Sequence, residues 1–177
     1  MFTKNWYKIM ADAMMTTAKE KELESGAVDY NGTTRNLYYR DANSIVSALN
    51  LRNMVRSVIT NAIVNTSNGV CFGDGTTPAT MDDYNLSGNM ITTIVTNDAP
   101  TVTVDDEGVT LSVVYTVTNT GSEDITISEV CMFNYWYYTS SSYTCYLLER
   151  TLLDSPVTIP AGGVGQVTYT IRMNYPT

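Results

Sequence analysis

The stretch that decides the fold is Val109-Thr110-Leu111-Ser112-Val113-Val114-Tyr115-Thr116-Val117-Thr118. Apolar side chains stand at every second position from residue 109 to residue 117, and most positions between them carry a hydroxyl group. Successive residues of a strand point to opposite faces of a sheet, so this alternation predicts a strand with one buried and one solvated face. Residues 164–174 repeat the pattern with Val164, Val167, Tyr169, Ile171 and Met173.

Outward from these two stretches, short β-type runs alternate with turn signals from residue 69 onward. Clusters of Gly, Asn, Asp, Ser and Pro separate the runs, as in residues 119–123 and 160–163. Evenly spaced strands with such turns predict a mainly β fold, an antiparallel β-sandwich of the jelly-roll or Ig-like kind, with one buried and one solvated face per sheet. We expect strands near residues 69–72, 88–96, 101–105, 109–119, 124–134, 143–150, 156–159 and 165–174.

The N-terminal residues 2–24 predict an amphipathic helix. Such a helix can dock its apolar stripe on another subunit or pack it within its own chain. The segment 27–68 is less regular, with a turn signal at Asn31-Gly32, a short strand signal at 37–40 and a β-branched run at 55–64. We therefore divide the chain into an attachment arm, residues 1–40, and a β-sandwich domain, residues 41–177. The candidate docking residues are Phe2, Trp6, Ile9, Met10 and Ala13.

Charge is spread unevenly along the 177 residues, which carry a formal net charge of −8. Residues 1–56 hold eight Lys and Arg against six Asp and Glu, for +2, whereas residues 57–177 hold two against twelve, for −10. Such an acidic body disfavours nucleic acid and anionic membranes as partners. No run of the sequence approaches the ~20 apolar residues of a transmembrane helix. We therefore expect no nucleic-acid partner and no membrane insertion.

The sequence offers few residues for catalysis or for a cofactor. It contains no His, which removes Ser-His-Asp and Cys-His catalysis and most catalytic zinc sites. The loop at 72–78 has two glycines but no Lys, so it is no phosphate-binding loop. We expect no catalytic residues, no metal and no cofactor. An enzyme that hydrolyses glycans with paired carboxylates is the alternative, and its candidate pairs are Asp82 with Asp83 and Glu129 with Glu149.

The three cysteines are expected to be buried thiols, since free Cys is among the most buried residue types. Their odd number leaves any disulfide framework incomplete. A bridge between Cys131 and Cys145 across one hairpin stays open, and Cys71 is the third cysteine.

Aromatic residues crowd the hairpin 133–143, whose tip is rich in Ser. Tyr and Trp give a large contact area at low entropic cost, which suits a glycan or a protein neighbour. Alternatively, alternate rings lie in the core and the others are single surface aromatics, or the hairpin lies in a subunit interface. The candidate recognition residues are Tyr135, Trp136, Tyr137, Tyr138 and Tyr143.

Three sequence boxes follow one another in the body of the chain. The first covers 70–78 and continues through Asp83-Tyr84-Asn85-Leu86. The second covers 117–121 and 125–133, and the third covers Leu147-Leu148-Glu149-Arg150, 156–162 and 167–172. In this order, over about residues 45–173, they resemble small virion proteins of tailed bacteriophages, of the tail-fibre-like, collar or minor structural kind.

The resemblance implies a non-enzymatic virion structural protein on the tail, collar or fibre apparatus. Its N-terminal arm would dock on the particle and its β-sandwich would be displayed. A capsid decoration or head-fibre protein is one alternative, and a carbohydrate- or receptor-binding module that uses the hairpin 133–143 is another. The implied partners are other virion proteins, further copies of the chain in a homo-oligomer, and a host surface glycan. The N-terminus lacks the continuous apolar core of a signal peptide, so we expect synthesis in the host cytoplasm.

Overall fold

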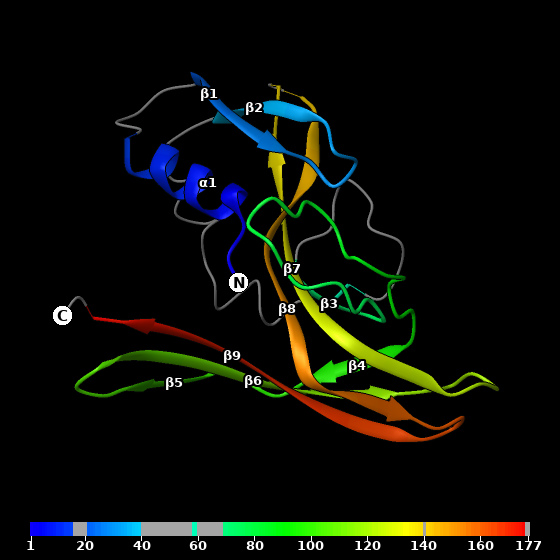
Figure 1. Ribbon diagram of the computed structural model, residues 1–177. Coiled ribbons are helices and arrows are strands. Elements are labelled where there is room, and N and C mark those ends of the chain that lie inside the picture. The colour runs from blue at the N-terminus through cyan, green and yellow to red at the C-terminus, as the bar shows by residue number, and fades with distance from the viewer. Residues whose placement is uncertain (16–20, 40–57, 60–68, 140, 176–177) are drawn as a thin grey trace.

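The computed structural model describes residues 1–15, 21–39, 58–59, 69–139 and 141–175 (Figure 1). The described strands pair antiparallel throughout. The predicted class, a mainly β antiparallel sandwich with an N-terminal helix, is confirmed. The elements are α1 (Lys4–Met15), β1 (Lys21–Val28), β2 (Thr34–Tyr39), β3 (Gly69–Gly73), β4 (Ile94–Asn97), β5 (Thr101–Val104), β6 (Gly108–Thr118), β7 (Ile125–Tyr137), β8 (Tyr143–Ile159) and β9 (Val164–Asn174).

The alternating stretch forms β6, the centre of a four-stranded sheet. β9 pairs with β6 along its whole length on one side, whereas β4 and β5 pair with its two halves on the other side. Pro100, which has no amide proton to donate, lies at the break between β4 and β5. Buried and half-buried residues alternate along β6, and the fully buried ones include Tyr115 and Val117. The predicted alternation is therefore confirmed for this sheet.

The middle of the three-stranded sheet β3-β7-β8 is buried on both faces, whereas residues 154–156 and 158 of β8 are exposed. Residues 127–134 of β7 and 144–150 of β8 are all buried. One face packs toward the four-stranded sheet, and the other lies against residues of the β3–β4 connection, among them Leu86 and Met90. The expectation of one solvated face per sheet is wrong here, because this connection covers the second face.

The main core lies between the two sheets and extends up to α1. The long β7–β8 hairpin packs on the four-stranded sheet near its open end, and its turn reaches β1 and β2 (Figure 1). Each strand of the core directs alternate residues inward, so residues that are far apart in sequence meet there. Its largest members include Tyr115, Tyr146, Phe72, Ile127 and Met132.

Residues 1–39 share this core, as far as they are described. Thr3 joins the chain start to β8, with its amide donating to the Leu148 carbonyl at 2.9 Å and its hydroxyl to the Leu147 carbonyl at 2.6 Å. Ala27 of β1 and Leu37 of β2 are fully buried in the same cluster. The described part of the predicted arm therefore packs on the predicted domain.

Two predicted boundaries differ from the structure. The helix expected over 2–24 ends at Met15, and residues 21–28 form a strand because they pair with β2. Pairing within the β1–β2 hairpin overrides the local helix preference of the charged run. The strand expected over 88–96 is shorter in the structure and consists of β4 alone. Residues 88–93 belong instead to the β3–β4 connection, which covers the three-stranded sheet.

The remaining strand predictions agree with the structure where it describes them. Residues 143–150 and 156–159, expected as two strands, form the single strand β8. The strand signal at 37–40 corresponds to β2, and the turns expected at 105–108, 119–123, 139–142 and 160–163 join successive strands. The run 55–64 lies outside the described residues, apart from Ile59 and Val58, which bridges to Val70.

Candidate functional site

A buried ion network links three distant parts of the chain. Arg150 on β8 is only 1% exposed. Its Nε donates to Glu129 Oε2 at 2.6 Å, its Nη1 to Asp83 Oδ2 at 2.6 Å and its Nη2 to the Thr77 carbonyl at 2.5 Å. A guanidinium is tolerated in the interior when its N–H groups meet acids and carbonyls. The network therefore ties residues 77–83 to β7 and β8.

Glu129 of β7 is the second centre of this network and is fully buried. Its Oε1 accepts the backbone N–H groups of Ser87 and Gly88 at 3.1 and 3.0 Å. The backbone of the connection comes so close that a Cβ on Gly75 would lie 2.3 Å from Glu129 Oε1. Only glycine fits there, so the glycines of the 72–78 loop allow close packing against a carboxylate.

Hydrogen bonds within the network favour the charged forms of Asp83 and Arg150. Burial alone would raise the pKa of Asp83, but hydrogen bonds from Thr80 and Arg150 outweigh burial and hold that pKa below its ordinary value. Burial lowers the pKa of the Arg150 guanidinium, and its bonds to Glu129 and Asp83 outweigh this and raise it. A carboxylate held ionised in this way is poorly suited to act as a general acid.

A hollow of about 390 Å³ lies beside the network, and its wall includes Asp82, Asp83 and Arg150. Asp82 is exposed and pairs with Lys4 at 2.5 Å, whereas Asp83 pairs with Arg150 at 2.6 Å. The two neighbouring carboxylates are therefore each engaged by a different cation.

The other candidate carboxylate pair is split between the two faces of its sheet. Glu149 faces the core between the sheets, where Tyr169 of β9 donates to it at 2.5 Å. Glu129 faces the β3–β4 connection. Glycoside hydrolysis needs two carboxyl groups roughly 5–10 Å apart across a shared cleft. The described geometry does not bring Glu129 and Glu149 to one cleft.

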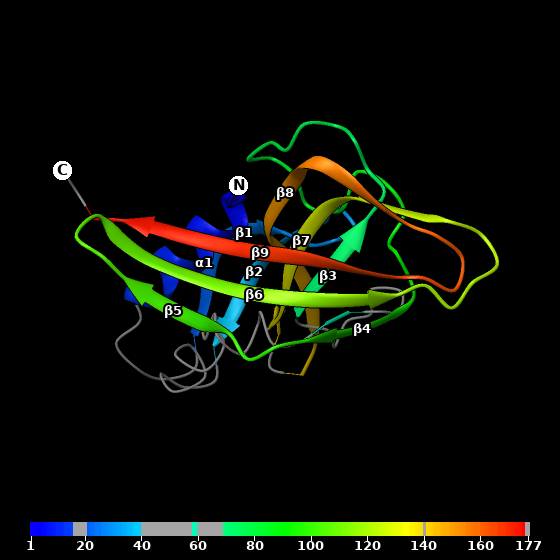
Figure 2. The same cartoon turned by 90° about the horizontal axis from the view of Figure 1, so that it is seen from below.

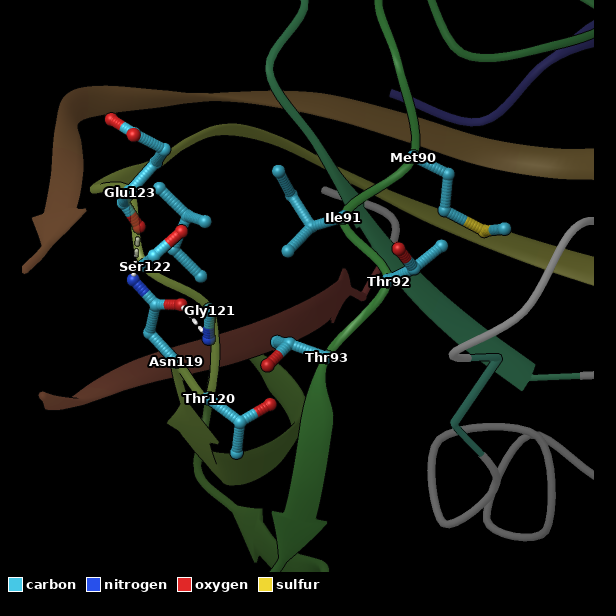
Figure 3. Close-up of a pocket in the computed structure, with 10 residues that line it drawn as sticks. Met90, Ile91, Thr92, Thr93, Asn119, Thr120, Gly121, Ser122 and Glu123 are labelled. Atoms are coloured by element: carbon cyan, nitrogen blue, oxygen red, sulfur yellow. Dashed lines mark hydrogen bonds between the residues drawn. The ribbon is translucent and has the colours of Figure 1, made fainter. Parts of the chain in front are cut away.

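A groove of about 480 Å³ lies between residues 90–93 and the turn that follows β6 (Figure 3). Figure 3 shows Ile91 and Thr93 pointing across it toward that turn. Asn119 holds the turn, because its Nδ2 donates to the Glu123 carbonyl at 2.8 Å and its Oδ1 accepts the Gly121 amide at 3.0 Å. The groove thus offers hydroxyl groups and the Glu123 carboxylate, with no cation among its lining residues.

The aromatic hairpin divides its rings between the interior and the surface. Trp136 is 4% exposed and lies in the core, so its ring is not available to a partner of the folded chain. Tyr135 is exposed, and the Tyr143 ring lies 5.7 Å from it and 5.4 Å from the Tyr137 ring, between centroids. The structure therefore brings three of the five predicted recognition residues together.

Tyr138, the remaining recognition candidate, contacts β2 instead. The Arg35 guanidinium lies 4.1 Å from the centroid of the Tyr138 ring, in a cation–π contact. Arg35 in turn pairs with the buried carboxylate of Asp29 at 2.6 Å. Tyr138 thus joins the hairpin tip to the β1–β2 hairpin.

The predicted docking stripe is packed within this same chain. Trp6 and Ile9 lie in the core, Phe2 stacks on Trp6 with ring centroids 4.6 Å apart, and Met10 is half-buried against the same cluster. The side chain of Ala13 lies outside the described residues. The stripe therefore follows the alternative of packing within the chain, and the outer side of α1 carries the exposed Tyr7.

The three cysteines are buried thiols and none forms a disulfide. Cys131 is the register partner of Cys71 on β3, and Cys145 pairs with Tyr135, so the bridge left open between Cys131 and Cys145 is not present. Burial, together with a hydrogen bond to Cys71, raises the pKa of the Cys131 thiol well above its ordinary value.

No group of His, Cys, Asp and Glu in the described residues is arranged to hold a metal ion. No helix in the same part of the chain has both the length and the apolar character needed to cross a membrane.

Comparisons with family models, with curated proteins and with solved structures find no match for this chain. A function for this chain is therefore inferred from the sequence boxes and from the geometry of the described residues. The Arg150 network is the feature that sequence reasoning missed. Its signal was the charged pair Glu149-Arg150 directly after two leucines in a predicted strand, because charges in an apolar strand need buried partners.

Proposed function

We propose that the chain is a non-enzymatic structural protein of a bacteriophage virion, with its β-sandwich displayed on the tail, collar or fibre apparatus. The observation that carries this proposal is the meeting of the three sequence boxes in one buried network. Asp83 comes from the first box, Glu129 from the second and Arg150 from the third. Each of the three boxes behind the resemblance thus contributes one residue to this buried network.

The same network supports a structural rather than a chemical role. Three charged residues of the two-layer interior, Glu129, Glu149 and Arg150, are buried. Each forms a hydrogen bond with another protein group. Groups so engaged stabilise a rigid body, which suits a part that is built into a larger particle.

Docking through the N-terminal region has to use surface that the fold leaves open. Trp6 and Ile9 support the core, so an unchanged fold would dock through the outer side of α1, where Tyr7 is 55% exposed and Lys4 is also exposed. Tyr and Met are enriched at protein interfaces, and Met1 is also exposed in the N-terminal region.

Mass spectrometry of purified particles of the phage that encodes the chain tests the assignment. We expect the chain at a constant copy number per particle, and its absence from particles would refute the proposal.

Removal of residues 2–24 is a poor docking test, because it takes Trp6 and Ile9 out of the core. Tyr7→Glu tests docking on the intact fold, and Tyr84→Glu, at another exposed tyrosine, is the matched control. We expect only Tyr7→Glu to lower the copy number. Equal incorporation of both variants would reject docking through this side of α1.

A receptor- or carbohydrate-binding module is the second candidate. The cluster of the exposed Tyr135 with the half-buried Tyr137 and Tyr143 favours it. Neighbouring surface rings with centroids 5.4 and 5.7 Å apart offer apolar area together with hydroxyl groups. Glycan-array binding by the intact chain tests this function. We expect Tyr135→Ala to abolish binding and Tyr84→Ala to leave it unchanged. No glycan binding by the intact chain would refute this candidate.

A further inference from the structure

No described segment covers the outer face of the four-stranded sheet, on which the β9 residues are exposed and most β6 residues are half-buried. Figure 2 looks onto this face, with β6 and β9 in front and β7, β8 and α1 behind. The strand registers place on it the even-numbered residues of β4, β6 and β9, together with Thr101 and Thr103 of β5. We call this set the hydroxyl face, because eight of its residues are threonines.

The hydroxyl face carries almost no charge, although the chain is strongly acidic. None of its residues is Asp or Glu, in a chain with 18 acidic residues and a net charge of −8. Its one charged residue, Arg172, lies at the end of the face and pairs with Asp105 of the β5–β6 turn at 2.9 Å. Surfaces of soluble proteins normally carry interspersed charges, which limit the association of copies. This face lacks them.

We propose that the hydroxyl face is a self-association surface, and that its partner is the same face of a second copy of this chain. Two copies of an acidic chain repel each other over most of their surface, and here they can approach without opposed carboxylates. A hydroxyl both donates and accepts hydrogen bonds, so a face of threonines is complementary to itself. The half-buried Val114 near its centre adds apolar contact.

The layered architecture leaves room for this contact. The other described layers, β3, β7, β8 and α1, lie behind the sheet in Figure 2, so two copies can stack sheet on sheet at the usual spacing of about 10 Å. The face runs the full length of β6 and β9, which are strands of 11 residues each. This inference does not rest on the virion assignment, since association of the isolated chain can be measured directly.

Analytical ultracentrifugation of the full chain, over a concentration series, is the test. We expect a reversible monomer–dimer equilibrium that shifts toward dimer as salt is raised, because salt screens the repulsion between acidic copies. Thr168→Glu places a carboxylate near the middle of the face and is expected to raise the dimer Kd at least tenfold. A chain that stays monomeric at all concentrations and salt levels would overturn the proposal.

The fold supplies a matched control on another sheet surface. Thr158 pairs with Thr126 through their hydroxyl groups at 3.0 Å, much as Thr170 pairs with Ser112 at 3.2 Å on the hydroxyl face. Thr158→Glu adds the same charge away from the face, so the dimer Kd should not change. Equal effects of the two Glu variants would reject the assignment of the face. Thr168→Lys, with folding checked by circular dichroism, repeats the test with the opposite charge if Thr168→Glu fails to fold.

Discussion

Glu129 and Arg150 form an ion pair at 2.6 Å in which the two side chains are 0% and 1% exposed. Such a pair does not by itself make a fold stable, because both ions lose their hydration. It does make the fold intolerant of losing either partner, since the other charge then remains buried alone. The pair also fixes the β3–β4 connection on the sheet, because Arg150 binds Asp83 and Glu129 accepts the Ser87 and Gly88 amides.

The first prediction concerns the loss of one member of this pair. Arg150→Met should lower the free energy of unfolding by about 3–5 kcal/mol, because Glu129 is left as a buried charge and Asp83 loses its cation. Urea unfolding monitored by Trp fluorescence measures the loss. Arg172→Met is the control, because Arg172 forms an exposed pair and exposed pairs contribute little. Similar losses in both variants would contradict a special role for the buried pair.

The second prediction concerns the close approach at Gly75. A Cβ there would lie 2.3 Å from Glu129 Oε1 and 2.6 Å from the Gly88 backbone nitrogen, so Gly75→Ala should destabilise the chain by about 1–3 kcal/mol through overpacking. Gly162→Ala is a contrasting variant. Its φ of 70° is unfavourable for Ala, but a Cβ there meets no atom within 4 Å. We therefore expect Gly75→Ala, and not Gly162→Ala, to increase hydrogen exchange in residues 74–90.

The third prediction compares two buried tyrosine hydroxyls. Tyr169 donates to Glu149 at 2.5 Å, so Tyr169→Phe should cost about 1–3 kcal/mol of unfolding free energy by weakening the solvation of a buried carboxylate. The Tyr146 hydroxyl is buried without a hydrogen-bond partner, so Tyr146→Phe should be neutral or slightly stabilising. Chemical unfolding curves of both variants provide the measurement. A larger loss for Tyr146→Phe than for Tyr169→Phe would contradict the assigned contacts.

The fourth prediction concerns pH. The Arg172 guanidinium and the backbone amides of Glu107 and Gly108 lower the pKa of Asp105 to about 2. A carboxyl whose pKa is depressed in the folded state stabilises the fold above its unfolded pKa of about 3.9, and that contribution is lost as pH falls from about 4 to about 2. An NMR titration of the Asp105 side chain should show a midpoint near 2. Arg172→Gln should move the midpoint upward, whereas an unchanged midpoint would exclude Arg172 as the main cause.

The strands that could be predicted are those whose burial depends on one neighbouring layer. β6 and β9 show plain alternation because their outer face is open, and turn residues mark their ends. The continuous burial of 127–134 could not be predicted, since it depends on a connection folding over the sheet from elsewhere in the sequence. The same connection includes residues 88–93, for which the sequence predicts a strand.

The candidate sites were predicted less completely than the fold. The composition indicates an aromatic hairpin but not which of its rings are exposed. The side of the strand on which a ring lies determines its burial, so Trp136 lies in the core whereas Tyr135 is exposed. The stripe with Trp6 and Ile9 was recognised as apolar, but helical spacing does not say which surface covers it. The Arg150 network joins residues up to 73 positions apart, a separation that no local pattern spans.

The burial of every cysteine has a practical consequence for studying this protein. Cys71, Cys131 and Cys145 are each 0% exposed. Thiol reagents such as maleimides need an accessible thiolate, so the native fold should stay unlabelled without removal of any cysteine. A single cysteine introduced on the surface would then be the only reactive one, so a fluorophore, spin label or gold particle could be attached at one chosen position of the folded chain.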